Sequence, residues 1–217
     1  MNRKITVKGT GYAHVKPNLI VITLTVNSKN FEYEAAMRMA SDASHQLADA
    51  IEGLDFTKEN LKTIDFDVNT EYKSEQDKHG NFQSVFVGYQ VHQSFRLEFA
   101  LDFKLLKRTL TAISKLSVNP ILNIQFTVKD SAVVNEMLLK SATQNAKEAA
   151  VILADASGVQ LGDLLDIDYN WSRIDLYSKT DYRVRTSSLK LSAEINPYIV
   201  PEDIDVTDNV TFVWAIK

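Results

Sequence analysis

Aspartate pairs of the form Asp-x-Asp are the residues whose spacing comes nearest to a metal-binding pattern in this chain. Three pairs occur, and they are Asp65 with Asp67, Asp166 with Asp168, and Asp203 with Asp205. On a β-strand both carboxylates of a pair face the same side, where they could bind Ca²⁺ or Mg²⁺ if two pairs met. The intervening residue is apolar each time, which favours an ordinary strand with one face in the core; these residues are Phe66, Ile167 and Ile204. We therefore predict no metal site.

The histidines show no metal-binding spacing either. They are His14, His45, His79 and His92. None has another histidine at i, i+4 or belongs to a histidine-carboxylate zinc signature. His14 and His92 fall on expected strands and could approach each other, although a strand histidine is usually a partly buried polar residue. We predict no catalytic residue among them.

Nucleotide-binding and hydrolase motifs are missing. The run Gly9-Thr10-Gly11 is half of a dinucleotide fingerprint at most, because the third glycine and the following helix start are absent. The sequence contains neither a Gly-x-Ser-x-Gly elbow nor a Walker loop. We expect no cofactor.

A late segment, residues 171–198, combines aromatic and arginine residues without a clear helix or strand pattern. Such side chains are enriched at protein interfaces. A surface loop or extra hairpin is the plainer and favoured interpretation, since long loops are either functional or merely irregular. The candidate interaction surface in this segment consists of Trp171, Arg173, Tyr177, Tyr182, Arg183 and Arg185.

The composition is that of an ordinary globular protein. The chain has 217 residues, of which 45% are hydrophobic and 24% charged, and it contains no cysteine, which excludes disulfides and thiolate zinc sites. A net charge of −4 argues against a nucleic-acid partner, and no apolar run is long enough to suggest a membrane span. We expect a cytoplasmic protein if the chain is complete, and a periplasmic or envelope protein if a signal peptide was removed.

The chain is expected to open with a β-hairpin. Residues 5–8 and 20–26 alternate apolar and polar side chains, and Lys16-Pro17-Asn18 is interpreted as the turn between them. Gly9 and Gly11 would permit a bulge or the close approach of another backbone.

Three amphipathic helices are expected after this hairpin. The first covers residues 31–54, with Asn30 as its cap and Gly53 as its stop. Its apolar stripe is Ala36, Ala40, Ala43, Leu47, Ala50 and Leu54. The second helix is capped by Asp102 and carries the stripe Leu106, Leu110 and Ile113.

The third helix begins after Asp130 or Ser131 and ends near Gly158. Its predicted inner face is Leu138, Ala142, Ala146, Ala149, Leu153 and Ala156. Alanine-rich faces allow close packing, so these faces belong either to the core or to a subunit contact.

The remaining pattern predicts a long hairpin from residues 61–73 and 85–99, and further strands at 121–128, 164–169 and 206–216. Strands and helices do not alternate strictly, which favours an α+β fold over a doubly wound parallel one. We predict two small antiparallel-sheet subdomains with long amphipathic helices packed on the sheets.

Several short motifs occur together in a fixed order. They are residues 7–11 (VKGTG), 15–18 (VKPN), the first alanine-rich helix, 61–63 (LKT), 87–89 (VGY), 154–162 (ADASGVQLG), and Asn196-Pro197 with Pro201-Glu202. Together they resemble the SIMPL domain family over nearly the whole chain. The resemblance implies a single SIMPL-type domain over residues 1–217, with two intertwined subdomains divided as a strand- and helix-rich part at 1–170 and a loop plus final strand at 171–217.

The resemblance also implies a function class. Bacterial relatives include periplasmic immunogenic and outer-membrane-associated proteins that form ring-like homo-oligomers, and an animal member was named for association with a signalling kinase. The family has no established catalytic motif, so no catalytic residue can be transferred. This sequence departs from the family pattern in two places. Many bacterial relatives carry a secretion leader, and none is visible in this sequence. Residues 171–195 also look longer than the corresponding loop of typical relatives.

Taken together, the sequence favours a non-enzymatic protein that acts through homo-oligomerisation and protein-protein contact. A stress- or envelope-related role follows from the resemblance alone. The alternative is a small-molecule-binding or enzymatic protein with a pocket between its subdomains, where such sites often occur.

Overall fold

The computed structural model describes residues 3–76, 80–170, 174–185 and 199–217, without the side chains of residues 184 and 185. The chain divides into two compact units, each assembled from separated stretches of sequence. We call them the three-stranded unit (residues 1–18, 127–179 and 201–217) and the five-stranded unit (residues 19–126 and 180–200), after the sheet that each contains. Both sheets carry helices, and antiparallel strand pairs build each of them, which confirms the predicted α+β fold class.

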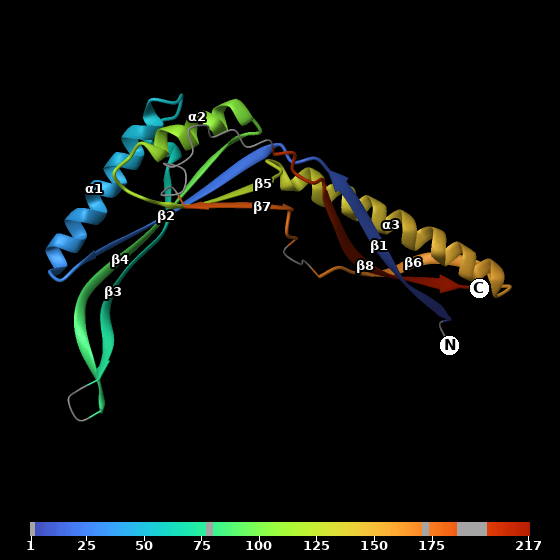
Figure 1. Ribbon diagram of the computed structural model, residues 1–217. Coiled ribbons are helices and arrows are strands. Elements are labelled where there is room, and N and C mark those ends of the chain that lie inside the picture. The colour runs from blue at the N-terminus through green and yellow to red at the C-terminus, as the bar shows by residue number, and fades with distance from the viewer. Residues whose placement is uncertain (1–2, 77–79, 171–173, 186–198) are drawn as a thin grey trace. The chain divides into compact units, whose positions relative to one another are not determined.

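The three-stranded unit is a sheet with one long helix packed on it (Figure 1). Its strand order is β1-β8-β6. The elements are β1 (Lys4–Val15), α3 (Ser131–Ala156), β6 (Leu161–Asp168) and β8 (Ile204–Ile216). The core between α3 and the sheet consists of Val7, Ala142, Ala146, Ala150, Val210, Phe212 and Trp214.

Two glycines of β1 let α3 lie unusually close to the sheet. A β-carbon on Gly9 would stand 2.0 Å from the carbonyl oxygen of Ala142, and one on Gly11 would stand 2.1 Å from that of Leu138. The predicted close approach of another backbone at these glycines is therefore confirmed. The alanines of α3 serve the same purpose, because a larger side chain would hold the helix away from the strand.

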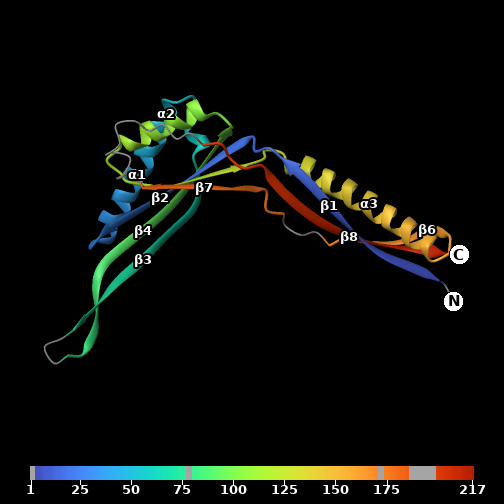
Figure 2. The same ribbon diagram turned by 45° about the vertical axis from the view of Figure 1, so that its right-hand side comes forward.

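The five-stranded unit has the strand order β3-β4-β2-β5-β7. Its strands are β2 (Leu19–Asn30), β3 (Lys62–Gln76), β4 (Phe82–Ala100), β5 (Ile121–Thr127) and β7 (Tyr177–Arg185). The helices are α1 (Tyr33–Glu52), the short η1 (Lys58–Asn60) and α2 (Phe103–Ser114). Figures 1 and 2 show α1 and α2 on the same side of this sheet. The core between them includes Ile22, Leu24, Leu47, Ile51, Phe95, Leu97, Leu106, Leu110, Ile113 and Phe126.

The predicted opening hairpin is wrong. β1 pairs along its whole length with β8, from Lys4 opposite Ala215 to Val15 opposite Ile204, and β2 pairs with β4. The two strands belong to different sheets, so Lys16-Pro17-Asn18 is a connection between the units. The alternation identified both strands correctly but could not identify partners that lie far away in the sequence.

The helix caps follow local sequence rules. The carboxylate of Asp102 accepts hydrogen bonds from the backbone N–H groups of Lys104 (2.8 Å) and Leu105 (3.1 Å), and Asp130 caps α3 in the same way. Asn30 is not a cap, because it ends β2 and helix α1 begins two residues after Phe31. The predicted caps Asp102 and Asp130 are thus confirmed. The predicted stripe of α2, Leu106, Leu110 and Ile113, is confirmed as buried.

The predicted stripes of the long helices are right in their first halves only. In α1 the buried stripe continues to Ile51 rather than to Ala50 and Leu54. In α3 it continues to Ala150 and Ala154, while Leu153 is 48% exposed. The alanine faces are buried within each unit, so they supply core packing and no free subunit surface.

Candidate interaction surface

The paired strands β3 and β4 extend past the N-terminal end of helix α1 as a two-stranded arm, visible in Figures 1 and 2. We define the arm as residues 70–76 of β3 and 82–89 of β4. None of the 15 residues of β3 is buried, and β3 is an edge strand whose one neighbour in the described sheet is β4. A long exposed edge strand is a template for pairing with another chain.

Five aromatic side chains form a continuous cluster at the base of this arm, and we call it the aromatic cluster. Its members are Phe31, Tyr33, Tyr72, Phe86 and Tyr89. Phe86 is at its centre, with ring centroids 5.3 Å from Phe31, 5.3 Å from Tyr89 and 5.8 Å from Tyr72, each in an edge-to-face arrangement. Such pairs are favourable beyond the apolar area that they bury.

The outer members of the aromatic cluster are open to solvent. Phe31 is 62% exposed, Tyr33 48% and Tyr72 60%. Phe82, nearer the end of the arm, is 75% exposed. Contiguous apolar patches of this kind mark interaction sites more often than isolated exposed residues do.

A β-bulge brings these aromatic rings onto one face. The register between β3 and β4 shifts between Glu71 and Tyr72, so that Tyr72 is opposite Phe86. Gly88 lies at the bulge with φ of 130°, and a β-carbon there would stand 2.6 Å from the carbonyl oxygen of Asn30. Only glycine combines this backbone conformation with so close a contact.

The other face of the same strands is polar. Lys29 forms an ion pair with Glu71, and the side-chain oxygen of Asn27 lies 2.8 Å from Nδ1 of His92. Because β2 and β4 alternate, these groups lie opposite the side that packs on α1. The strands are therefore amphipathic here, with α1 on one face, where Ala36 and Ala40 pack on Val91, and polar groups on the other.

The sequence-predicted interaction residues occupy a different strand. Tyr177, Tyr182 and Arg183 lie on strand β7, in a segment where the sequence shows no clear helix or strand pattern. Tyr182 is 37% exposed, and Arg183 pairs with Asp181 at 3.1 Å. Neighbouring strand residues face opposite sides, so Tyr182 and Arg183 do not share a face. Arg185 also belongs to β7, and Trp171 and Arg173 lie outside the described residues.

His14 is the histidine with the most specific surroundings. Its Nδ1 lies 2.6 Å from the carboxylate of Asp205, and its Nε2 lies 3.0 Å from that of Asp203. Hydrogen bonding and charge from Asp205, with a smaller contribution from Asp203, raise the pKa of His14. Two acceptors engage both ring nitrogens, which suits the imidazolium form and leaves no free nitrogen for proton transfer.

His92 belongs to the five-stranded unit and has its own partners. Its Nε2 lies 3.5 Å from Asp65 and its Nδ1 contacts Asn27. Among the described residues, no group of three or more histidine and acidic side chains is arranged to hold a metal ion.

The middle residues of the acidic pairs differ from expectation. Ile204 is buried, as predicted, whereas Phe66 is 47% and Ile167 53% exposed. Both exposed residues belong to edge strands of the described sheets, β3 and β6. Within the described part of the chain, no helix is both long and apolar enough to cross a bilayer.

Comparison with known proteins places this architecture in a family. Residues 5–214 match the family described as SIMPL, protein of unknown function (DUF541). The chain belongs to the SIMPL family. This confirms the resemblance drawn from the short motifs, which span the same range.

Two curated relatives of this SIMPL chain are 26 kDa periplasmic immunogenic proteins, one from Brucella abortus (strain S19) and one from Brucella melitensis biotype 1. Each is 30% identical over 169 residues, covering 76% of this chain. The SIMPL chain spans 65% of the length of these relatives.

The aromatic cluster is absent from the expectations drawn from the sequence. The helical pattern places Phe31 in the first helix, and the alternation places the aromatic residues of the hairpin in an ordinary sheet. The length of the hairpin strands was the available signal for an uncovered arm. β3 and β4 have 15 and 19 residues, whereas helix α1 has 20. A helix rises about 1.5 Å per residue and a strand about 3.3 Å, so one helix of this length cannot cover the whole hairpin.

Proposed function

We propose that this protein acts through homo-oligomerisation and protein-protein contact rather than through catalysis, and that the aromatic cluster of the arm is its main contact surface. The observation that carries the proposal is the exposure of Tyr72 on the edge strand β3 and of Phe31 in the same aromatic cluster. Tyrosine and phenylalanine are enriched in the buried centres of interfaces.

A second copy of the chain fits this surface better than a small ligand does. The aromatic cluster is built on β3, β4, the connection between β2 and α1 and the first residue of α1, which makes it broad rather than enclosed. The edge of β3 adds backbone hydrogen-bonding groups beside it. In a two-fold dimer the same patch would contact itself, so a single surface would be sufficient.

The names of the two relatives support a cellular location for this protein. Both are named as periplasmic proteins, and we infer a periplasmic or envelope location for this chain as well. A role in envelope maintenance or stress response accords with a protein that assembles and whose described residues form no recognised catalytic group. Assembly is the part of the proposal that can be measured directly.

Size-exclusion chromatography with light scattering tests the proposal through two tyrosines of nearly equal exposure. Tyr72→Ser removes a 60% exposed ring of the aromatic cluster, while Tyr12→Ser removes a 63% exposed ring from β1 of the other unit. We expect wild type and Tyr12→Ser to elute as oligomers and Tyr72→Ser to shift toward monomer. A monomeric wild-type protein, or equal masses for the two variants, would refute the assigned surface.

A further inference from the structure

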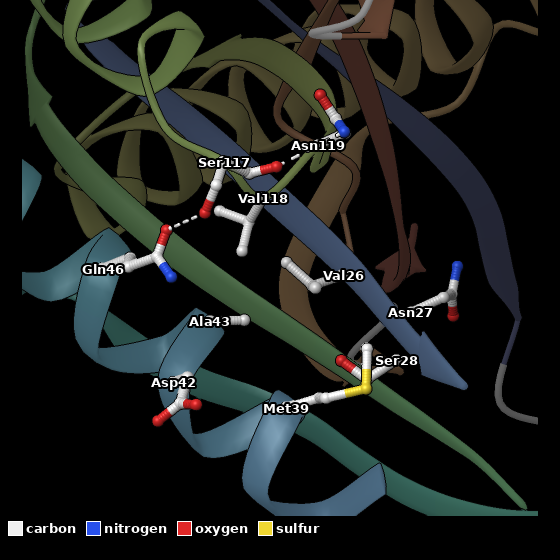
Figure 3. Close-up of a pocket in the computed structure, with 10 residues that line it drawn as sticks. All are labelled: Val26, Asn27, Ser28, Met39, Asp42, Ala43, Gln46, Ser117, Val118 and Asn119. Carbon is white, nitrogen blue, oxygen red and sulfur yellow. Dashed lines mark hydrogen bonds between the residues drawn. The ribbon is translucent and has the colours of Figure 1, made fainter. Parts of the chain in front are cut away.

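A pocket of about 450 Å³ opens between helix α1 and strand β2 inside the five-stranded unit. It is separate from the aromatic cluster, and its volume lies in the range typical of small-molecule sites. Figure 3 shows α1 along one side, β2 along the other and residues 117–119 across one end. The lining residues are Val26, Asn27, Ser28, Met39, Asp42, Ala43, Gln46, Ser117, Val118 and Asn119.

The pocket exists because β5 is shorter than β2. β5 has 7 residues and β2 has 12, and the end of β5 lies beside the start of β2, where the N–H of Asn18 bonds to the carbonyl of Thr127 at 2.9 Å. Residues 26–28 of β2 pair with β4 on one edge, but on the edge toward β5 they lie next to the loop that precedes β5. This leaves a gap in the wall of the sheet below α1.

Ser28 places an unused polar group in the pocket wall. The residue is only 6% exposed, yet its hydroxyl has no hydrogen-bond partner among the described residues. The Ser28 hydroxyl is not among the buried side-chain atoms that lack a partner, so it is open to water in the pocket and available to a bound donor or acceptor. The neighbouring amide of Gln46 is already ordered, because its oxygen accepts a hydrogen bond from Ser117 at 2.6 Å.

Charge and apolar surface narrow the class of ligand. Asp42 supplies the single charged side chain among the lining residues, and it has no ion-pair partner within the described part of the chain. Val26, Met39, Ala43 and Val118 supply apolar surface beside it. A ligand that satisfies both features has one cationic group and a small apolar body.

We propose that this pocket binds a small organic amine, with its ammonium group at Asp42, a hydrogen bond at Ser28 and its apolar part against Val26, Ala43 and Met39. The carboxylate attracts the cation, and the described residues that line the pocket include no basic side chain that would favour an acid instead. The site lies within one unit, so it differs from the pocket between subdomains that the sequence suggested.

Benzylamine is a suitable probe, with benzyl alcohol and benzoate as neutral and anionic counterparts of the same size. Two-dimensional NMR titration of the full chain would measure binding and its location together. We expect saturable shifts at residues 26–28 and 42–46 with benzylamine, weaker binding of benzyl alcohol and none of benzoate. The variant Asp42→Asn should weaken benzylamine binding about fivefold, the upper range for an exposed ion pair.

A matched control comes from the same helix. Glu34→Gln also removes one negative charge from exposed α1, but Glu34 pairs with Arg38 at 3.5 Å and does not line the pocket. Its affinity for benzylamine should equal that of wild type. Ser28→Ala gives a second arm, and it should weaken binding while leaving the fold intact because it removes an unbonded hydroxyl.

Three results would overturn the proposal. They are the absence of saturable shifts at the pocket, equal affinity in Asp42→Asn and Glu34→Gln, and binding of benzoate as tight as that of benzylamine. None of these results bears on self-association, because the aromatic cluster is unchanged in every variant.

Discussion

Replacing Gly9 by alanine tests the close packing of α3 on β1 most sharply. The new β-carbon would stand 2.0 Å from the carbonyl oxygen of Ala142 and 2.7 Å from the β-carbon of Ala146. Both contacts involve atoms fixed by the helix backbone, so α3 must move away by roughly 1 Å, and overpacking of this kind costs about 1–3 kcal/mol. Alanine also restricts the unfolded chain, which offsets about 0.4–1 kcal/mol. We expect Gly9→Ala to lower the free energy of unfolding by about 1–2 kcal/mol.

Trp214 makes this change measurable in the three-stranded unit. Its ring stacks on Phe212 with centroids 5.4 Å apart, and in a Trp171→Phe background it is the remaining tryptophan of the chain. Urea unfolding followed by Trp214 fluorescence then measures the unfolding of the three-stranded unit. Gly53→Ala is the control, because a β-carbon there meets nothing within 4 Å, and circular dichroism should show equal or slightly higher stability. A Gly9→Ala protein as stable as wild type would refute the packing argument.

Three further changes have defined outcomes. Asp130→Ala removes the carboxylate that accepts hydrogen bonds from Ala132 and Val133, and urea unfolding should show a loss of about 1 kcal/mol. Leu47→Ala, at a fully buried position, should cost about 2–5 kcal/mol, whereas Leu153→Ala, 48% exposed, should cost under about 1 kcal/mol; equal losses would contradict the observed stripes. Asp205 and Asp203 raise the pKa of His14 from 6.5, so its contribution to stability should be complete below pH 6.5 and disappear as the pH rises through the folded-state pKa. The His14→Gln variant should lack this pH-dependent part of the unfolding curve, and a curve identical to that of wild type would contradict the assignment.

Local signals in the sequence predict local structure well. Asp102 and Asp130 are recognisable as caps because a short acidic side chain before an apolar stripe satisfies free N–H groups within two or three residues. Long-range pairing cannot be predicted in the same way. The alternation of β1 is equally compatible with β2 and with β8, and β8 begins at Ile204, 200 positions after β1 begins at Lys4.

The helix faces show the limit of periodicity. In α3 alanines occur at both 149 and 150, so the sequence permits two stripes. The structure buries Ala150 and Ala154, which continue the strict spacing of four that begins at Val134 and passes through Leu138 and Ala142. The direction in which a helix crosses a twisted sheet decides between such stripes, and this direction is a tertiary property.

The aromatic cluster depends on tertiary structure in a similar way. Tyr72 and Phe86 come to share a face only because the bulge at Gly88 shifts the register. Tyr72 stays exposed, and Phe86 only half-buried, because α1 begins at Tyr33 and does not cover them. The pocket at Ser28 likewise follows from the different lengths of β2 and β5. Neither feature has a sequence motif of its own.

Hydrogen exchange of the arm, compared between dilute and concentrated protein, tests self-association at the proposed surface most directly. Oligomers formed through this surface should protect the backbone N–H groups of residues 70–76 at high concentration, and both dilution and Tyr72→Ser should remove that protection. Exchange in the arm that is fast and identical at every concentration would contradict the account.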